Sequence, residues 1–244
     1  MKLRDNTVLI SGGGSGIGLA LAKAMASRAN TVIICGRNAE KLAAVRKENP
    51  GIVTFTSDIA NDEDQQRLVE SVALKYPNLN MLINNAGIQH NYDFTDTKSH
   101  LDLIIEEVNV NFLAHIKLID RFVPSLLRHP SAAIVNITSA LALVPKQSAP
   151  IYCATKAAMH NFTKALRYQL EKTPIKVFEI IPALVDTAMT KGRGKSKITP
   201  DALAAEALRG FASDNYEIRV EKTKILFALH RFLPSVAEGI IRNG

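Results

Sequence analysis

The sequence predicts a single α/β domain in which a parallel sheet is covered by helices on both faces. Short apolar runs alternate with longer helical patterns as far as Ile181, which is typical of strands joined by crossover helices. The apolar runs are continuous, as expected for strands buried on both faces. Glycine-rich and polar segments follow the strands, where such sheets bind their ligands. These observations predict a Rossmann-type, doubly wound parallel sheet in a three-layer α/β/α arrangement.

The expected strands and helices follow one another in a regular order. The hydrophobic patterns predict strands at residues 7–10, 31–35, 52–56, 80–83, 132–137 and 176–181. Helices are expected from the glycine-rich turn to about residue 29, and at 39–47, 62–75, 101–128 and 151–172. The remaining chain is expected to form a helix at 200–211, a short strand at 216–220, a helix at 221–232 and a final helical turn or two after residue 234.

Composition narrows the function classes. Apolar residues make up 47% of the chain and charged residues 22%, which are ordinary globular values. The formal net charge is +7, but the basic residues are scattered and no aromatic-basic cluster accompanies them, so we expect no nucleic-acid partner. The histidines show no metal-ligand spacing, so we expect no metal site.

The chain shows no sign of export or of a membrane span. Its two cysteines, Cys35 and Cys153, make no disulfide framework, which fits a reducing compartment. No apolar run approaches the roughly 18 residues that a spanning helix needs. The first strand begins almost at the first residue, which leaves no room for a signal peptide. We therefore expect a cytoplasmic protein.

A glycine-rich turn joins the first strand to its helix and predicts a site for a dinucleotide. Glycine lets the backbone approach a pyrophosphate without a clashing side chain, and the helix N-terminus supplies free N–H groups and partial positive charge. The alternative is a tight turn without a ligand. The residues expected to hold the cofactor here are Ser11, Gly12, Gly14, Ser15, Gly16, Ile17 and Gly18.

The end of the second strand bears on the choice of cofactor. A site for NAD(H) usually has an acidic residue there to bind the ribose 2′-hydroxyl, but Gly36, Arg37 and Asn38 contain none. The Arg37 guanidinium suits the 2′-phosphate of NADP(H). We therefore favour NADP(H), with NAD(H) as the alternative if Arg37 merely faces solvent.

A tyrosine and a lysine four residues apart predict proton-transfer chemistry. Tyr152 and Lys156 share one face of the helix expected at 151–172. An ammonium group beside a phenol favours the phenolate, so the pKa of Tyr152 is expected to fall. Tyr152 would then give a proton to a carbonyl or take one from an alcohol. Ser139 ends the fifth strand, thirteen residues earlier, and its hydroxyl is suited to bind the substrate oxygen.

The order and spacing of these motifs resemble the short-chain dehydrogenase/reductase family over about residues 6–189. The glycines match the family pattern, with Ser11 in place of the usual threonine, and Asn84-Asn85-Ala86-Gly87 matches a second motif. By resemblance the catalytic tetrad is Asn111, Ser139, Tyr152 and Lys156. Asn109 and Thr138 are the alternatives for two of these positions, but Val110-Asn111-Phe112 and the thirteen-residue spacing fit the family better.

The resemblance assigns roles to further residues. Lys156 would also hold the nicotinamide ribose, Asn111 would position a water in a proton relay, and Thr187 would hold the nicotinamide carboxamide. Asp58 would contact the adenine, or else serve as a turn or helix-capping residue. Ala183 departs from the family's glycine, which leaves the path of its loop open. The remaining expected cofactor contacts are Ile59, Asn85, Ala86, Gly87, Pro182 and Val185.

The substrate side is less specified. In this family residues 184–199 would form a substrate lid, so we expect one domain over 1–244, with 184–244 as substrate loop and C-terminal extension. Lys191, Arg193, Lys195 and Lys197 either meet an anionic substrate or are solvated. Gln89, His90 and Tyr92 either line the pocket or lie on a surface loop, and Ala142, Leu143 and Val144 are expected to form an apolar wall.

The C-terminal part offers two further hints. Residues 216–224 resemble the DltE-type branch of the family, whose members accompany teichoic-acid D-alanylation genes in some bacteria. The apolar residues of the helix at 221–232 are expected in core packing or a subunit contact rather than on a membrane. Family members are commonly dimers or tetramers, so we expect a homodimer or homotetramer formed through the helices at 101–128 and 151–172.

These observations predict an NADP(H)-dependent oxidoreductase that interconverts the carbonyl and alcohol forms of a small-molecule substrate by hydride transfer. One alternative is a non-catalytic NADP(H)-binding sensor that binds a partner protein. A second is a polyanion-binding protein driven by the net charge of +7. The complete tetrad argues against both alternatives.

Overall fold

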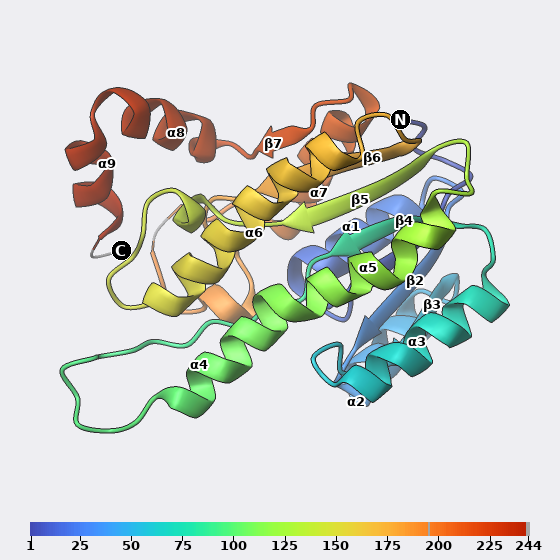
Figure 1. Ribbon diagram of the computed structural model, residues 1–244, viewed down its shortest axis with the longest axis horizontal. Helices are drawn as coiled ribbons and strands as arrows, with labels where there is room; N and C mark the ends of the chain where they lie inside the picture. Colours follow the sequence, from blue (N-terminus) through green and yellow to red (C-terminus); the bar gives the residue numbers. More distant parts are fainter. Residues whose placement is uncertain (195, 243–244) are drawn as a thin grey trace.

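A seven-stranded parallel sheet forms the centre of the molecule (Figure 1). The computed structural model describes residues 1–194 and 196–242. The strands lie in the order β3-β2-β1-β4-β5-β6-β7, and each neighbouring pair is parallel. The strands are β1 (Thr7–Ser11), β2 (Thr31–Gly36), β3 (Ile52–Thr56), β4 (Leu79–Asn84), β5 (Ala132–Ile137), β6 (Ile175–Ile181) and β7 (Glu217–Arg219). This topology confirms the predicted doubly wound sheet.

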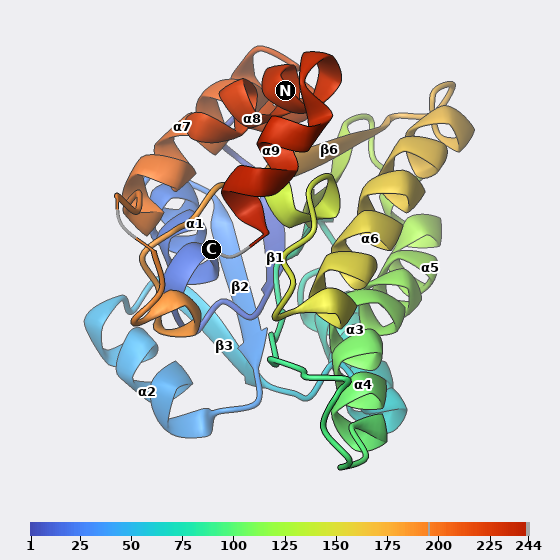
Figure 2. The same cartoon turned by 90° about the vertical axis from the view of Figure 1, so that its left-hand side faces the viewer.

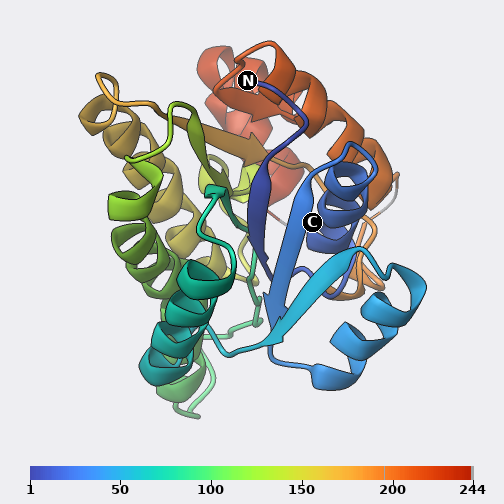
Figure 3. The ribbon, with the colours of Figure 1, turned by 90° about the vertical axis from the view of Figure 1, so that its right-hand side faces the viewer.

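Helices cover both faces of the sheet and complete the three layers (Figures 2 and 3). One face carries α1 (Gly16–Ala26), α2 (Ala39–Glu48) and α7 (Pro200–Ala212), and the other carries α3 (Asp62–Lys75), α4 (Leu101–Val108), α5 (Ala114–Leu126) and α6 (Pro150–Gln169). Successive strand residues point to opposite faces, so Val8 packs in the first core layer and Leu9 in the second. Both layers are apolar because both faces of the sheet are buried.

The strand order reverses at the centre of the sheet. β1 pairs with β2 on one side and with β4 on the other, so the connections that follow β1 and β4 leave in opposite directions. A doubly wound sheet opens a crevice at such a point, beyond the carboxyl ends of its strands. The predicted polar and glycine-rich segments all follow strands and therefore meet at this edge.

The expected element bounds differ from the observed ones by no more than three residues, with one correction inside a helix. The helix expected at 101–128 is interrupted by a π-helical segment, Asn109–Leu113, between α4 and α5. A π segment changes the hydrogen-bond step without changing the apolar pattern enough to be seen in the sequence, and such segments are frequent at functional sites. This one contains Asn111.

The C-terminal part extends the sheet and then leaves it. β7 pairs with β6, and α8 (Lys222–Phe232) and α9 (Pro234–Ile241) follow, drawn in red in Figure 1. Ile225 is 69% exposed and Phe232 75% exposed, so core packing is wrong for these two side chains; Thr223 is the one buried residue of α8. A contact with a second subunit stays a prediction. Within the described residues no helix combines the length and apolarity needed to cross a bilayer.

Candidate active site

A cavity of about 400 Å³ lies at the carboxyl edge of the sheet. Its wall is formed by segments that follow β1 to β6, so residues distant in the sequence meet around one space. The predicted site residues in the wall are Gly12, Gly14, Ser15, Gly16, Ile17, Arg37, Asp58, Ile59, Asn85, Ala86, Gly87, Tyr152, Lys156, Pro182 and Thr187. We call the part of the wall around Arg37 the outer end and the part around Tyr152 and Lys156 the inner end; the glycine turn belongs to the same wall.

The glycine turn is shaped by close contact with the segment after β4. Gly12 has a φ of +66°, and a side-chain carbon there would lie 2.8 Å from the Cα of Ala86. A side-chain carbon at Gly18 would lie 2.5 Å from the Gly12 carbonyl oxygen. These glycines are therefore required for the two chain segments to pass each other. Ser15 stands at the N-cap of α1 without a capping hydrogen bond from its side chain, which leaves the first N–H groups of the helix for a ligand.

Ser11 supports the turn from behind. Its Oγ accepts hydrogen bonds from the backbone N–H groups of Asn85 (3.0 Å) and Ala86 (3.1 Å), and Asn85 Nδ2 donates to the Ser11 carbonyl at 3.0 Å. Hydrogen bonds from the Asn84–Gly87 segment therefore hold the glycine-rich turn in place. Ser11, Gly18 and Val185 were predicted to contact the cofactor, but the structure buries or packs them behind the cavity wall.

The outer end of the cavity carries two cations. Arg37 Nη1 lies 3.5 Å from Glu106 Oε1 and 4.0 Å from Asp58 Oδ2. Lys41 lines the same end from the first turn of α2, where its backbone N–H donates to the capping Asn38 side chain at 2.8 Å. Sequence reasoning missed Lys41; the signal was a basic residue three positions after a capping residue that follows a strand. It also missed Glu106, which only the fold brings beside Arg37.

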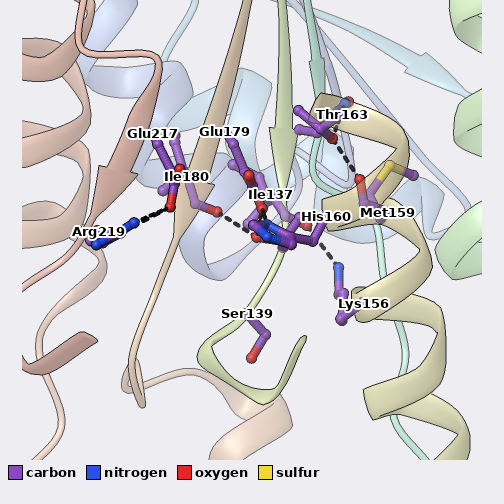
Figure 4. Close-up of polar contacts among 12 residues, drawn as sticks. Ile137, Ser139, Lys156, Met159, His160, Thr163, Glu179, Ile180, Glu217 and Arg219 are labelled. Atoms are coloured by element: carbon purple, nitrogen blue, oxygen red, sulfur yellow. Dashed lines mark hydrogen bonds and ion pairs between the residues drawn. The ribbon is translucent and has the colours of Figure 1, made fainter. Parts of the chain in front are cut away.

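Tyr152 and Lys156 are both buried at the inner end, 9% and 4% exposed. They lie one turn apart on α6, and Lys156 Nζ is 5.7 Å from the centre of the Tyr152 ring. Lys156 Nζ also donates to the Ile137 carbonyl at 2.8 Å, so its side chain points at the end of β5 near Ser139 (Figure 4). The ammonium group is thereby held at the place where β5 gives way to the Ser139 segment.

Burial sets the proton affinity of both groups. It raises the pKa of Tyr152 to about 12, against the effect of a hydrogen bond with Ser139. The direction is opposite to the fall in pKa that we expected from the Tyr–Lys pair. The reason is that burial destabilises the phenolate more than the neighbouring groups stabilise it. Burial also lowers the pKa of Lys156 to about 8, against the attraction of Glu179. Tyr152 is therefore held as a phenol, the form that donates a proton.

Asn111 connects three elements beside Lys156. Its Oδ1 accepts from the Ile88 N–H at 2.8 Å, and its Nδ2 donates to the Ile88 carbonyl at 2.9 Å and to Thr155 Oγ1 at 3.3 Å. A side-chain carbon at Gly87 would lie 3.3 Å from Asn111 Oδ1 and 3.8 Å from Lys156 Nζ. The π segment, the loop after β4 and α6 thus converge here. The water relay through Asn111 stays a prediction.

Ser139 is the second residue after β5 and is buried. Its Oγ accepts from the Leu141 N–H at 3.1 Å, and its hydroxyl is near enough to Tyr152 to oppose the rise in the pKa of that phenol. The alternative at this position, Thr138, donates its hydroxyl to Glu179 instead, at 2.6 Å. Asn111, Ser139, Tyr152 and Lys156 therefore lie near one another, but only Tyr152 and Lys156 line the cavity, together with Thr138, whose hydroxyl is engaged by Glu179. The choice of Ser139 stays a prediction.

The loop after β4 is mainly structural. Tyr92 is buried and its hydroxyl donates to Glu107 Oε2 at 2.7 Å, while His90 Nε2 lies 3.1 Å from Glu106 Oε2. Gln89 is only partly buried. Tyr92 therefore holds the loop against α4 and does not lie on a surface loop, and Gln89, His90 and Tyr92 do not line the cavity. Val144 is fully buried and Ala142 and Leu143 are partly buried, but none of the three lines the cavity, so the apolar wall stays a prediction.

The expected lid begins and ends at a parallel bridge between Val185 and Ile198. Met189 of this segment lines the cavity, and Lys197 Nζ donates to the Thr190 carbonyl at 2.6 Å, so Lys197 is used within the loop. Lys191 is exposed and Arg193 is half-buried. Lys195, the remaining member of the basic run, lies outside the described residues.

Sequence comparisons point to one family. Residues 6–197 match the family model for short chain dehydrogenases. The chain is 43% identical over 217 residues to an uncharacterized oxidoreductase, DltE, of Bacillus subtilis (strain 168), covering 88% of this chain and 83% of that protein. It is 31% identical over 211 residues to an uncharacterized oxidoreductase of Staphylococcus aureus (strain MW2), covering 84% and 90% of the two chains.

Solved structures show the same fold. A 3-ketoacyl-(acyl-carrier-protein) reductase from Brucella melitensis, complexed with NADH, superposes with a TM-score of 0.80 at 26% identity, over 86% of this chain and 91% of that one. A short chain dehydrogenase from Burkholderia cenocepacia, in complex with NADP, superposes with a TM-score of 0.87 over the full length of both chains. Its identity is 22%, so this second likeness concerns the fold alone.

Proposed function

This chain belongs to the short-chain dehydrogenase/reductase family and to its DltE-like branch, and from that premise we propose that it transfers hydride between NADP(H) and a small carbonyl or alcohol substrate. The observation that carries the proposal is the placement of the tetrad. Tyr152 and Lys156 line the same cavity as Arg37 and Lys41, and Ser139 lies behind its wall, close enough to Tyr152 to affect the pKa of that phenol. One site thus joins a proton donor to an anion-binding end.

The wall of the cavity fits a dinucleotide. A side-chain carbon at Gly14 would meet only Leu42 Cδ2 at 3.6 Å and Lys41 Cβ at 3.9 Å, so the turn leaves room for a pyrophosphate in front of the α1 N-terminus. Gly12, Gly14, Ser15, Gly16 and Ile17 would hold the phosphates, and Thr187 and Pro182 the nicotinamide. The bound nicotinamide supplies or accepts the hydride.

The chain's own residues handle the substrate oxygen. Burial keeps Tyr152 protonated at neutral pH, so its phenol donates a proton to the carbonyl oxygen as the carbonyl is reduced. The Ser139 hydroxyl donates a hydrogen bond to the same oxygen, whose negative charge grows during the reaction. The Lys156 ammonium stabilises the Tyr152 phenolate that remains. In the oxidation of an alcohol the same groups act in reverse.

The preference for NADP(H) over NAD(H) rests on the outer end of the cavity. Proteins of this fold occur with NADP and with NADH, so the fold does not decide the matter. Arg37 and Lys41 supply two cations, and no carboxylate follows β2 directly. A 2′-phosphate would replace the long contacts of Arg37 with Glu106 and Asp58 by a shorter, charge-assisted pair.

A fluorescence titration tests the cofactor assignment. We expect the purified chain to bind NADPH more tightly than NADH. Arg37→Ala should weaken NADPH binding by about 10- to 100-fold, the worth of one charge-assisted contact, and leave NADH binding unchanged. Arg46→Ala is the matched control, because Arg46 is exposed on α2 away from the cavity. Tighter binding of NADH would refute the roles of Arg37 and Lys41.

A carbonyl screen with the preferred cofactor separates the enzyme from the sensor. An enzyme consumes NADPH with some members of a panel of aldehydes and ketones, whereas a sensor binds NADPH and reduces none of them. Binding of a polyanion that is indifferent to cofactor would instead support the electrostatic alternative. Failure of both cofactors to bind would overturn the proposal as a whole.

A homodimer or homotetramer is proposed for the assembly. Leu101, Leu103 and Ile105 of α4 are exposed large apolar side chains, and a second subunit would cover them. Light scattering after size-exclusion chromatography measures the mass directly. A monomer at micromolar concentration would contradict this part of the proposal.

A further inference from the structure

A buried carboxylate lies behind the site, and the mechanism above leaves it without a role. Glu179 of β6 is fully buried. Its Oε1 accepts hydrogen bonds from Thr138 Oγ1 at 2.6 Å and from His160 Nδ1 at 2.8 Å. Its Oε2 has no hydrogen-bond partner among the described residues. Figure 4 shows Glu179 and His160 close to the end of β5, with Lys156 one helical turn from His160.

Such a carboxylate requires a compensating charge. An ionised carboxylate taken out of water costs several kcal/mol unless a positive group lies near it, and both hydrogen bonds of Glu179 fall on one oxygen. Lys156 has the converse need, because it is a buried ammonium group whose hydrogen bond goes to the neutral Ile137 carbonyl. Lys156 therefore has no anion in direct contact among the residues that the structure describes, and the charge of Glu179 is balanced by its neighbour His160 only when that imidazole is protonated.

The end of β5 connects the two groups through two adjacent residues, without a direct ion pair between them. Ile137 accepts from Lys156, and the following residue, Thr138, donates to Glu179. His160 approaches Glu179 from α6, four residues beyond Lys156 on the same face of the helix. The residue after Thr138 is Ser139, so the segment that binds Glu179 also leads directly into a second residue of the proposed catalytic tetrad.

We propose that Glu179 is a positioning residue that serves as the buried counter-ion of Lys156, and that Thr138 and His160 hold its carboxylate in that place. The inference deepens the proposed function, because it concerns the Lys156 of that site. Burial lowers the pKa of Lys156, and the negative charge of Glu179 opposes this by favouring the charged form of Lys156. Loss of the Glu179 charge should therefore leave Lys156 neutral at a lower pH.

The other charged groups nearby are accounted for. On β7, Glu217 is paired with Arg219 at 2.7 Å, so its charge is compensated. On α5, His115 is kept neutral, because burial and then the charge of Lys156 lower its pKa to about 4. Glu179 raises the pKa of His160, and a protonated His160 would cancel the carboxylate's charge; the effect on Lys156 is therefore greatest at alkaline pH. The remaining cations on α6 are Lys164 and Arg167.

The direct test is the titration of Lys156 by NMR in the full chain, with lysine labelled by ¹³C at Cε. The signal of Lys156 is assigned by its loss in Lys156→Arg. Glu179→Gln keeps the shape and one acceptor oxygen but removes the charge, and we expect the Lys156 midpoint to fall by about one pH unit, as for the loss of one nearby buried charge. Glu217→Gln is the control and should leave the midpoint unchanged. Equal midpoints in the original chain and Glu179→Gln would overturn the inference.

A second pair of variants decides the question if Glu179→Gln fails to fold. The His160 side chain is 22% exposed, so position 160 has room for a longer side chain. His160→Arg places a permanent positive charge beside Glu179 and neutralises the pair, whereas His160→Gln places no charge there and leaves the carboxylate uncompensated. The midpoint of Lys156 should be lower in the Arg variant than in the Gln variant, and equal midpoints would contradict the role of Glu179.

The pH profile of turnover links the inference to catalysis. With a carbonyl substrate from the screen, kcat/KM should decline at a lower pH in Glu179→Gln than in the original chain, by the same shift as the NMR midpoint. A wild-type chain that reduces no carbonyl would defeat the proposed function while the NMR titration still decides the role of Glu179. An NMR shift with an unchanged turnover profile would show that the Lys156 charge does not limit turnover and would refute the catalytic consequence.

Discussion

The two ends of the cavity are built in different ways. At the glycine turn, which we call the phosphate end, the backbone forms the binding surface. Gly12 and Gly18 have room for no side chain, and the uncapped N–H groups of α1 face the cavity. At the catalytic end Tyr152 and Lys156 act through side chains whose protonation is set by burial. Binding geometry is therefore local and steric, whereas reactivity depends on the surrounding fold.

The largest expected effect separates the two ends. Tyr152→Phe removes the proton donor and should lower kcat/KM for carbonyl reduction by about 10²- to 10⁴-fold, the usual worth of a general acid. The Kd for NADPH should stay within about twofold, because the phosphate end is untouched. Stopped-flow turnover and fluorescence titration of the same preparation measure both quantities. Retained turnover would remove Tyr152 from the mechanism, and lost NADPH binding would show that the two ends are not independent.

A pair of glycine substitutions tests the steric nature of the phosphate end. Gly18→Ala places a carbon 2.5 Å from the Gly12 carbonyl oxygen and should lower the free energy of unfolding by about 1–3 kcal/mol, the cost of overpacking. Gly14→Ala is the matched control in the same turn, since its new carbon meets nothing closer than 3.6 Å. Urea unfolding without cofactor measures both. Equal stability losses would mean that the turn is not shaped by close approach.

The smallest expected effect concerns the outer cations. Glu106→Gln frees Arg37 from a partly exposed ion pair and should tighten NADPH binding by about two- to fivefold, the worth of a surface salt bridge. NADH binding should not change, because it has no 2′-phosphate. Fluorescence titration at two ionic strengths measures the effect, which should shrink at high salt. Weaker NADPH binding would indicate that Glu106 positions Arg37 rather than competing for it.

Most of the fold was predictable because its pattern is local. The strand and helix bounds followed from apolar periodicity, and the observed elements differ from the expected ones by few residues. The candidate site was also found from the sequence, because parallel strands place the ends of distant segments at one edge. The order and spacing of the motifs were therefore enough to select Asn111, Ser139, Tyr152 and Lys156 as candidates.

The features that escaped prediction are those that depend on contacts between distant segments. The π segment at Asn109–Leu113 leaves the apolar pattern almost unchanged. Glu106 reaches Arg37 only because α4 packs beside the end of β2. The role of Ser11 behind the turn depends on the loop after β4.

The sequence by itself determined the order of the strands and helices, the family and the residues that form the candidate site, since periodicity and spacing are properties of the chain. The tertiary structure decided how those residues ionise. A tyrosine beside a lysine predicts an acidic phenol, yet burial raises the pKa of Tyr152 and lowers that of Lys156. The physical reason is that the cost of removing a charge from water depends on everything packed around it, including a carboxylate such as Glu179, which comes from another strand.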